Sequence, residues 1–165
     1  MSILPPDVYP NGDKCHYKKE KETLACTLES KGKRLNLQGN NSELALLIVA
    51  HGSRNPEANE ELLALCVKLR SRFPVVEPAF LEIASPGIPQ AGENCAAKGA
   101  SQVVIVPYFL SPGVHVSEDL ETARKELASS FPTVEFILAG PIGLHPMVEQ
   151  ILIDRVHEAI QSRTD

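Results

Sequence analysis

Long apolar runs and clusters of basic residues are both missing from this 165-residue sequence. Its two longest apolar stretches, residues 44–50 and 103–110, are far shorter than the roughly 20 residues that a membrane-spanning helix needs. The N-terminus lacks the apolar segment typical of a secretory signal. The formal net charge is -5, so the basic surface that nucleic-acid binding requires is not expected. We therefore predict neither a membrane nor a nucleic-acid partner.

Cysteine is scarce, with four residues and no Cys-x-x-Cys pair, so the usual patterns of zinc knuckles and dithiol redox sites are absent. Cys66 and Cys95 fall among the apolar residues of predicted helices. We interpret them as small buried hydrophobic residues and predict a cytoplasmic protein. Cys15 and Cys26 lie in a polar segment that also holds His16, and we interpret them as incidental rather than as a metal site.

Glycine-rich phosphate loops and the common nucleophile motifs are absent as well. Neither GxGxxG nor a P-loop pattern occurs, so nucleotide phosphates lack their usual binding loop. A serine hydrolase would carry its serine in Gly-x-Ser-x-Gly, whereas Ser53 lies in His51-Gly-Ser-Arg54. A histidine phosphatase would need arginine directly before the histidine that follows its first strand, and this chain has Ala50 there. None of these enzyme classes is therefore expected.

The composition changes sharply near residue 43. Residues 1–43 are rich in Lys, Glu, Gly and Asn and show no apolar period, so they cannot bury enough surface to offset their ordering entropy. We predict that they form a flexible N-terminal extension, and that residues 44–163 form one α/β domain. The alternative, a short docked element, rests on four leucines: Leu24, Leu28, Leu35 and Leu37.

Beyond residue 43, short apolar runs alternate with segments of helical period. Strands are predicted at residues 44–50, 76–83, 103–109 and 134–139. Helices are predicted at residues 57–73 and 88–98, from about Ser117, and at 146–161. This alternation is typical of a parallel sheet with helices on both faces. The fold class is therefore a three-layer α/β domain with a four-stranded parallel sheet, comparable to half of a flavodoxin-like unit.

Three of the five histidines, His51, His115 and His145, follow predicted strands. Ligands of parallel sheets bind beyond the carboxyl ends of the strands. Together with Glu82, near the end of the second predicted strand, two imidazoles would form a donor set suited to a divalent first-row metal ion. His145 directly precedes Pro146 and is interpreted as shaping a helix entrance, although whether it reaches the site stays open.

Three segments together resemble the short cobalt chelatases of the CbiX type, which are relatives of sirohydrochlorin ferrochelatases and other class II chelatases. They are His51-Gly-Ser-Arg54, Ala79-Phe-Leu-Glu82 and Val106-Pro-Tyr-Phe-Leu-Ser-Pro-Gly-Val-His115-Val-Ser-Glu-Asp119. The resemblance covers residues 44 to about 161. The third segment is the most specific, whereas His-Gly-Ser alone is a weak signal.

The resemblance implies ATP-independent insertion of Co2+ or Fe2+ into sirohydrochlorin, in cobalamin or sirohaem biosynthesis. The metal would be a substrate, and no obligatory cofactor is implied. His51 would be the proton acceptor and a metal ligand, His115 the second catalytic ligand, and Glu82 a third metal ligand. The residues implied to contact the tetrapyrrole are Ser53, Arg54, Glu82, Leu110, Ser111, Pro112, Gly113, Val114 and His115. A homodimer is also implied, because longer relatives contain two fused units.

The macrocycle further needs a broad apolar slot, and the expected apolar residues are Pro107, Phe109, Leu110, Pro112 and Val114. Two other functions stay open. One is a non-catalytic protein that binds a tetrapyrrole or a divalent metal, and the other is a structural homodimer whose histidines are incidental. The sequence does not decide between cobalt, iron and nickel, because imidazole and carboxylate ligands accept all three.

Overall fold

The computed structural model describes residues 14–20, 23–30, 33–34, 43–143 and 145–163. The chain divides into two compact units, residues 1–40 and 41–165. None of the described helices is both long and apolar enough to cross a membrane.

The first unit contains a small antiparallel sheet in the order β1-β2-β3, with β1 Lys14–Glu20, β2 Thr23–Ser30 and β3 Lys33–Arg34. Strand β1 pairs with β2 from Lys14 opposite Glu29 to Glu20 opposite Thr23. The sequence pattern predicts no such sheet, because these strands lack apolar alternation and are paired through their backbones. The flexibility of residues 1–43 stays a prediction, and Leu35 and Leu37 lie outside the described residues.

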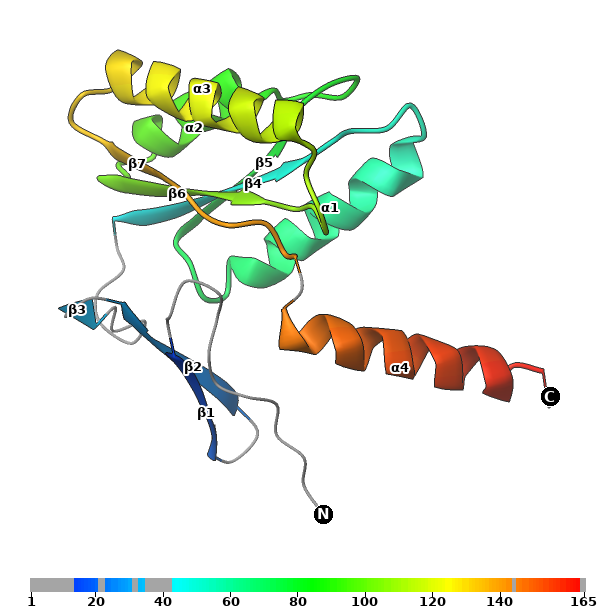
Figure 1. The fold of residues 1–165 in the computed structure, drawn as a ribbon. Coiled ribbons are helices and arrows are strands. Elements are labelled where there is room, and N and C mark those ends of the chain that lie inside the picture. The colour runs from blue at the N-terminus through cyan, green and yellow to red at the C-terminus, as the bar shows by residue number, and fades with distance from the viewer. Residues whose placement is uncertain (1–13, 21–22, 31–32, 35–42, 144, 164–165) are drawn as a thin grey trace. The chain divides into compact units, whose positions relative to one another are not determined.

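The second unit is built on a four-stranded parallel sheet in the order β5-β4-β6-β7 (Figure 1). Its strands are β4 Leu44–Ala50, β5 Val75–Phe80, β6 Gln102–Pro107 and β7 Glu135–Leu138. The helices that follow them are α1 Pro56–Leu69, α2 Ile88–Ala97, α3 Val114–Ser130 and α4 Pro146–Gln161. This architecture confirms the predicted four-stranded parallel α/β fold.

Several predicted element boundaries are wrong. The helix predicted to end at residue 73 ends at Leu69, and the strand predicted to end at residue 109 ends at Pro107. The strand predicted to end at residue 83 ends at Phe80, and the next residues form turns at the edge of the sheet. The helix predicted from about Ser117 begins three residues earlier, at Val114. The Ser117 hydroxyl does not cap that helix, because it donates to the carbonyl oxygen of Gly113 within the first turn.

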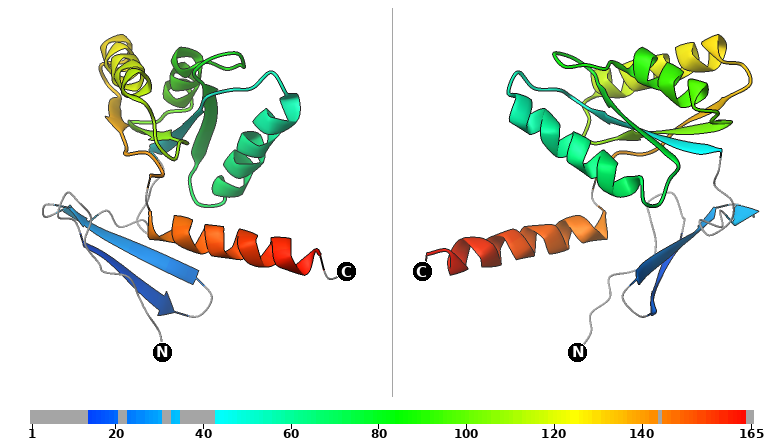
Figure 2. Two further views of the ribbon diagram at one scale, coloured as in Figure 1. Left: turned by 45° about the vertical axis from the view of Figure 1, so that its right-hand side comes forward. Right: turned by 180° about the vertical axis from the view of Figure 1, so that it is seen from behind.

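Helices α2 and α3 cover one face of the sheet, and α1 lies on the other (Figure 2). Strand β4 is central, and its side chains point alternately into the two cores, which explains its unbroken apolar sequence. On the α2 and α3 side the fully buried residues include Leu47, Val49, Ala91, Cys95, Val103, Ile105 and Leu120. On the α1 side they are Ile48, Leu62, Cys66, Val76 and Phe80.

Cys66 and Cys95 are free thiols buried in these cores, as predicted. Burial raises the pKa of the Cys66 thiol. Burial, reinforced by the nearby Glu77 carboxylate, raises the pKa of the Cys95 thiol to about 12. Both thiols therefore stay protonated near neutral pH and act as packing groups.

Candidate active site

The loops that follow the four parallel strands lie side by side at one edge of the sheet. The Glu82 N–H donates to the carbonyl oxygen of His51 at 3.0 Å, which joins the loops after β5 and β4. The Tyr108 N–H donates to the carbonyl oxygen of Val49 at 2.7 Å, so the chain leaving β6 stays beside β4. The predicted gathering of functional residues at one sheet edge follows from this parallel register.

The loop after β7 lies next to the loop after β6. Gly143 has a φ of +53°, and a Cβ atom built there would lie 3.9 Å from the carbonyl oxygen of Leu110. His145 ends this loop and caps α4, because its Nδ1 atom accepts the Met147 N–H at 3.2 Å. The predicted helix-entrance role of His145 is therefore confirmed.

Gly52 allows the loop after β4 to pack directly on the backbone of the loop after β5. Its φ is +93°, in the left-handed region that favours glycine. A Cβ atom at this position would overlap the carbonyl oxygen of Glu82. Two contacts therefore hold His51 near Glu82. One is the backbone hydrogen bond between these two residues, and the other is the close packing of Gly52 on the Glu82 carbonyl group.

Asn59, on the first turns of α1, organises the same loop, and sequence reasoning missed it. Its Oδ1 atom accepts the Ser53 N–H at 2.9 Å, and its Nδ2 group donates to the Ser53 carbonyl oxygen at 2.8 Å. The Ser53 hydroxyl accepts the Asn55 N–H at 3.0 Å, and Asn55 in turn caps α1 through Glu57. The available signal was the pair Asn55 and Asn59, four residues apart at a helix start.

Glu82 lies in a tight turn that is strained at the next residue. The Ala84 N–H donates to the Glu82 carbonyl oxygen at 2.6 Å, and Ile83 between them has a φ of +67°. A β-branched residue rarely adopts this conformation, which costs of order 1 kcal/mol or more. Because the Ile83 side chain is 59% exposed, its burial does not offset this cost.

His115 lies in the first turn of α3 and points into solvent. Its side chain is 98% exposed, and its Nδ1 atom lies 3.9 Å from Oε2 of Glu118 on the same helix. No three His, Cys, Asp or Glu side chains of the described residues are placed to hold one metal ion. The predicted ligand set of His51, Glu82 and His115 is therefore not preassembled in this arrangement, and it stays a prediction.

Exposed apolar side chains border this edge of the sheet, and they are Ile83, Tyr108, Leu110 and Val114. Leu110 and Val114 belong to the predicted apolar slot, and Phe109 and Pro112 are half-buried. Pro107 was expected there too, but it is buried at the end of β6, so that expectation is wrong. Ile83 and Tyr108 were not predicted as members of this rim.

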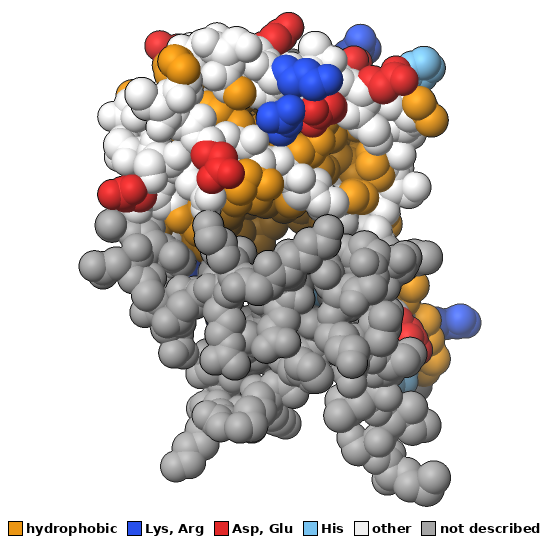
Figure 3. Space-filling view, turned by 60° about the vertical axis from the view of Figure 1, so that its left-hand side comes forward, with side chains coloured by type: hydrophobic (Ala, Val, Ile, Leu, Met, Phe, Trp, Pro, Cys, Tyr) orange, Lys and Arg blue, Asp and Glu red, His pale blue; other side chains and the backbone are white. Residues whose placement is uncertain are grey.

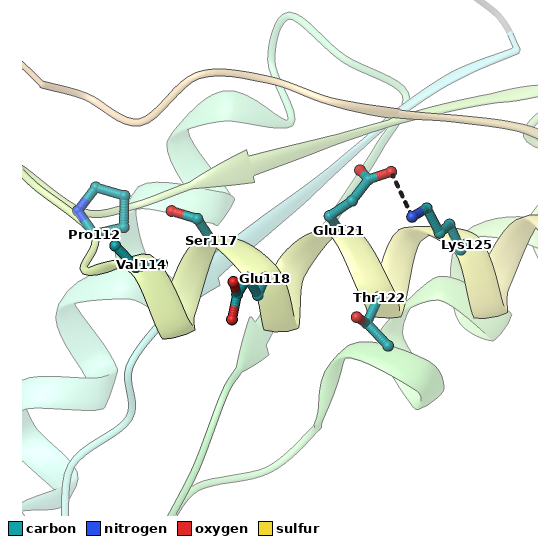
Figure 4. Close-up of a pocket in the computed structure, with 7 residues that line it drawn as sticks. All are labelled: Pro112, Val114, Ser117, Glu118, Glu121, Thr122 and Lys125. Carbon is teal, nitrogen blue, oxygen red and sulfur yellow. Dashed lines mark ion pairs between the residues drawn. The ribbon is translucent and has the colours of Figure 1, made fainter.

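An open groove of about 490 Å³ runs from this rim along α3 (Figure 4). Its lining residues are Pro112, Val114, Ser117, Glu118, Glu121, Thr122 and Lys125. A hydrogen bond from the Arg124 guanidinium lowers the pKa of the Glu121 carboxyl, so Glu121 stays ionised. Because two glutamates face one lysine in this groove, its outer part does not favour a polyanion.

Groups that can bind carboxylates lie closer to the sheet edge. Arg54 is exposed in the loop after β4. Helices α2 and α3 both begin at this edge with a glycine N-cap, Gly87 and Gly113, and no side chain caps either of them. Uncapped helix N-termini offer N–H donors to carboxylates. Ser111 lies in the loop before α3 and is exposed.

The chain is similar to known proteins of one family. The family model of CbiX matches residues 45–159. A chloroplastic sirohydrochlorin ferrochelatase of Arabidopsis thaliana is 34% identical over 118 residues, which are 70% of this chain and 52% of that protein. A sirohydrochlorin cobaltochelatase of Sulfolobus acidocaldarius is 32% identical over 117 residues, which are 71% of this chain and 93% of that protein.

A solved structure supports the same assignment. The sirohydrochlorin chelatase SirB from Bacillus subtilis subspecies spizizenii, in complex with cobalt, is similar with a TM-score of 0.66 and 30% identity, covering 70% of this chain and 50% of SirB. This chain thus spans about half the length of the plant and Bacillus relatives and nearly all of the Sulfolobus one. From its fold, its family match and these relatives, the chain belongs to the CbiX family.

Proposed function

We propose that this chain inserts a divalent metal, Co2+ or Fe2+, into sirohydrochlorin without ATP, in the biosynthesis of cobalamin or sirohaem. The observation that carries the proposal is the junction of His51 with Glu82 through Gly52, at the edge where the loop leading to His115 also emerges. The relatives named as sirohydrochlorin chelatases support the substrate.

Metal insertion replaces two pyrrole N–H protons of the macrocycle with one M2+ ion, so the site must both present a metal and remove protons. A neutral imidazole can do both, because its free nitrogen lone pair binds a metal or accepts a proton. We assign proton acceptance to His51 and assign metal binding to His51, His115 and Glu82. Since His115 projects freely from the first turn of α3, it would complete the ligand set only when metal and macrocycle are bound.

The sirohydrochlorin carboxylates need positive partners, although the chain as a whole is acidic. We assign this role to Arg54 and to the uncapped N-termini of α2 and α3. The macrocycle itself would lie on the exposed rim side chains Leu110 and Val114, between Ser53 on one side and the segment from Ser111 to Gly113 on the other.

We further propose a cytoplasmic homodimer without an added cofactor. The dimer is supported by relatives in which the matched segment of this chain covers only about half of the length. The cytoplasmic location is supported by the two free, buried thiols of the second unit.

The test is metallation of sirohydrochlorin, followed by absorbance under anaerobic conditions with Co2+ or Fe2+. We expect His51→Ala to reduce the rate by at least about 100-fold, since it removes a base and a ligand. His115→Ala should reduce the rate less. His157→Ala is the matched control, because His157 is an exposed histidine on α4, and it should retain the wild-type rate. Full turnover by both His51→Ala and His115→Ala would refute these roles.

The alternative is a protein that binds a tetrapyrrole without turnover. The observation that favours it is that the three predicted ligands are not grouped for a metal. A titration of sirohydrochlorin without metal separates the two functions. Saturable binding by the wild-type chain, with no metallation above the uncatalysed rate, would replace the chelatase assignment with this one.

A further inference from the structure

The four-stranded sheet has two outer strands, β5 and β7, because its strand order is β5-β4-β6-β7. The outer edge of such a strand presents backbone N–H and C=O groups that can pair with a strand of another chain. Ile137 of β7 is 37% exposed. Figure 3, seen from the side on which β7 lies, shows hydrophobic side chains at the surface of this unit. Edges of this kind promote association between copies unless their backbone groups are occupied.

The backbone direction of β5 identifies the groups that lie on its outer edge. Along a strand, the N–H and C=O groups of successive residues point alternately to its two sides. The Leu81 N–H, directly after β5, donates to the Ala50 carbonyl oxygen of β4 at 3.0 Å, so Leu81 points towards β4. Val76, Pro78 and Phe80 therefore point to the outer side of β5.

Each of these three residues has one backbone position that cannot pair with an incoming strand. Arg70, the C-cap residue of α1, donates from Nη2 to the Val76 carbonyl oxygen at 3.1 Å. Pro78 has no N–H group. The Phe80 N–H donates to the Pro86 carbonyl oxygen at 2.9 Å. Since an incoming strand pairs through the N–H and C=O groups of alternate residues, it lacks a partner group at every outer position of β5.

The outer edge of β7 is covered in a related way. The Ala139 N–H, directly after β7, donates to the Ile105 carbonyl oxygen of β6 at 2.9 Å. By the same alternation, Phe136 and Leu138 point to the outer side of β7. Arg124 of α3 donates from Nη1 to the Phe136 carbonyl oxygen at 3.5 Å. Because β7 has only four residues, the loss of this acceptor leaves little edge for pairing.

Two further hydrogen bonds hold the Arg124 guanidinium in place. Its Nε and Nη2 atoms donate to the Glu121 carboxylate at 2.8 and 2.7 Å, which leaves Nη1 for the strand. A guanidinium can bind both partners at once because its donors form a rigid fork. Arg70 and Arg124 come from helices on opposite faces of the sheet (Figure 2), and each binds one outer carbonyl oxygen. The two outer strands thus share one kind of cover.

We propose that Arg70 and Arg124 are edge guards, which keep β5 and β7 from pairing with strands of other copies of this chain. The proposal does not rest on the chelatase activity. A second copy is the partner excluded first, because every copy carries the same edges and a two-fold axis can bring identical edges together. Since each copy has two edges, loss of both guards would allow open-ended chains of copies.

The first experiment measures mass by light scattering over a range of protein concentrations. Arg124→Ala opens β7 and should at least double the mass relative to the wild-type chain at high concentration. Arg70→Ala combined with Pro78→Val opens β5 and should do the same, and all three substitutions together should give a larger mass than either. A folded chain that keeps the wild-type mass would overturn the role of the guard that it lacks. If the triple variant does not fold, the two simpler chains decide, each for its own edge.

Arg72→Ala combined with Lys125→Ala is the matched control, because it removes the same charge beside the two guards. Arg72 is exposed after α1, and the Lys125 Nζ atom lies 3.8 Å from Oε1 of Glu121. This chain should keep the wild-type mass at every concentration. If it associated as strongly as the variants without guards, net charge would explain the effect and the proposal would be wrong.

The second experiment separates pairing at an edge from association of unfolded chains. Hydrogen exchange, followed by mass spectrometry, is compared at low and high concentration. Pairing should slow the exchange of the Phe136 and Leu138 N–H groups in Arg124→Ala, and of the Val76 N–H in the chain with Arg70→Ala and Pro78→Val. Association without slower exchange in these strands would contradict an open edge.

Gly92→Ala is the control for lost stability, because a Cβ atom at Gly92 would overlap the Leu127 side chain, far along the sequence from either outer strand edge. Urea unfolding shows how much stability each variant loses. Gly92→Ala should keep the wild-type mass even where its loss of stability equals that of Arg124→Ala. Equal association of these two chains would show that unfolding causes it, and the edge guards would be refuted.

Discussion

Among single residues, Asn59 has the clearest structural role at the candidate site without taking part in its chemistry. Its carboxamide makes two hydrogen bonds to the Ser53 backbone, because it accepts the Ser53 N–H and donates to the Ser53 carbonyl oxygen. Through Ser53 it fixes the loop that begins with His51 and Gly52. The position of His51 therefore depends on a side chain of α1.

We expect Asn59→Ala to lower the free energy of unfolding by about 1–2 kcal/mol, because two partly buried hydrogen bonds are lost. The metallation rate should fall roughly tenfold, because the loop that carries His51 loses its anchor. Thermal unfolding and initial rates measure the two effects. Glu60→Ala, at the neighbouring exposed position, should change neither. An Asn59→Ala chain with the wild-type rate would show that Asn59 does not position His51.

Ile83 provides a second prediction, because its backbone strain and its side chain act in opposite directions. Asparagine tolerates the left-handed region, so Ile83→Asn should raise the free energy of unfolding by about 1 kcal/mol. It also removes an apolar side chain from the rim, so KM for sirohydrochlorin should rise while KM for the metal stays unchanged.

Val67→Asn is the control for Ile83→Asn, because Val67 is also an exposed β-branched residue but lies in α1, where φ is helical. It should not stabilise the chain. If both variants changed stability alike, relief of strain at Ile83 would not explain the gain. An unchanged KM for sirohydrochlorin would remove Ile83 from the binding rim.

The residues that sequence reasoning found and those it missed differ in what determines their positions. The placement of His51, Glu82 and His115 at one edge was predictable from the alternation of strands and helices, because parallel strands bring their carboxyl ends together, whereas their roles as ligands stay a prediction. Asn59 and Ile83 owe their roles to a pair of hydrogen bonds and to one φ angle. Neither the hydrogen bonds of Asn59 nor the φ angle of Ile83 produces a pattern in residue spacing, so the structure was needed to find them.

Among whole elements, the crossing of α2 and α3 depends on one small residue. Gly92 is buried in α2, and a Cβ atom there would overlap the side chain of Leu127 on α3. The two helices therefore pack closely enough to cover one face of the sheet and to start at the edge that carries the site. Their uncapped N-termini take their positions from this packing.

Gly92→Ala should therefore lower the free energy of unfolding by about 1–3 kcal/mol through overpacking, despite the better helix propensity of alanine. Adding Leu127→Ala should recover part of this loss, and a double-mutant cycle by urea unfolding measures the coupling. Gly140→Ala is the control, because a Cβ atom at Gly140 meets nothing within 4 Å. If the effects of Gly92→Ala and Leu127→Ala on the free energy of unfolding were additive, the close packing of α2 on α3 at this point would be contradicted.

The order and type of the elements in the second unit were predictable, but some of their ends were not. The apolar period indicates the helices of residues 44–163. Prolines in the first turns of α1, α2 and α4 are typical of helix starts. The start of α3 was missed because Ser117 resembles a capping residue, whereas Gly113 takes that place. The antiparallel strands β1 to β3 were missed because pairing of polar strands is not visible in an apolar pattern.

At the scale of the whole molecule, the resemblance to CbiX chelatases predicted the family and the sheet, and the comparisons confirm both. It did not predict that α4 would leave its own sheet. An amphipathic period specifies that one face of a helix will be buried, but not against which surface. Before α4, the Ala139 N–H donates to the Ile105 carbonyl oxygen and Gly143 lies beside the Leu110 backbone, and neither contact is visible in the apolar period of the helix.

The division of the chain into two units leads to the last prediction. The family match begins at residue 45, and residues 1–40 form a separate compact unit. A chain that starts at residue 41 should therefore keep the sheet of β4 to β7 and unfold in one cooperative transition. Circular dichroism during urea unfolding tests this, and metallation of sirohydrochlorin should proceed at the full-length rate because every proposed site residue is retained.

The same truncated chain also distinguishes the two units as sources of the dimer. If the proposed homodimer forms through the second unit, removal of residues 1–40 should leave the mass at that of two copies. A truncated chain that folds but is monomeric would instead place the dimer contact on the first unit, whose strand β1 lies at an edge of its sheet and could pair with another strand. A truncated chain that fails to fold would show that the second unit depends on the first, against their division into separate units.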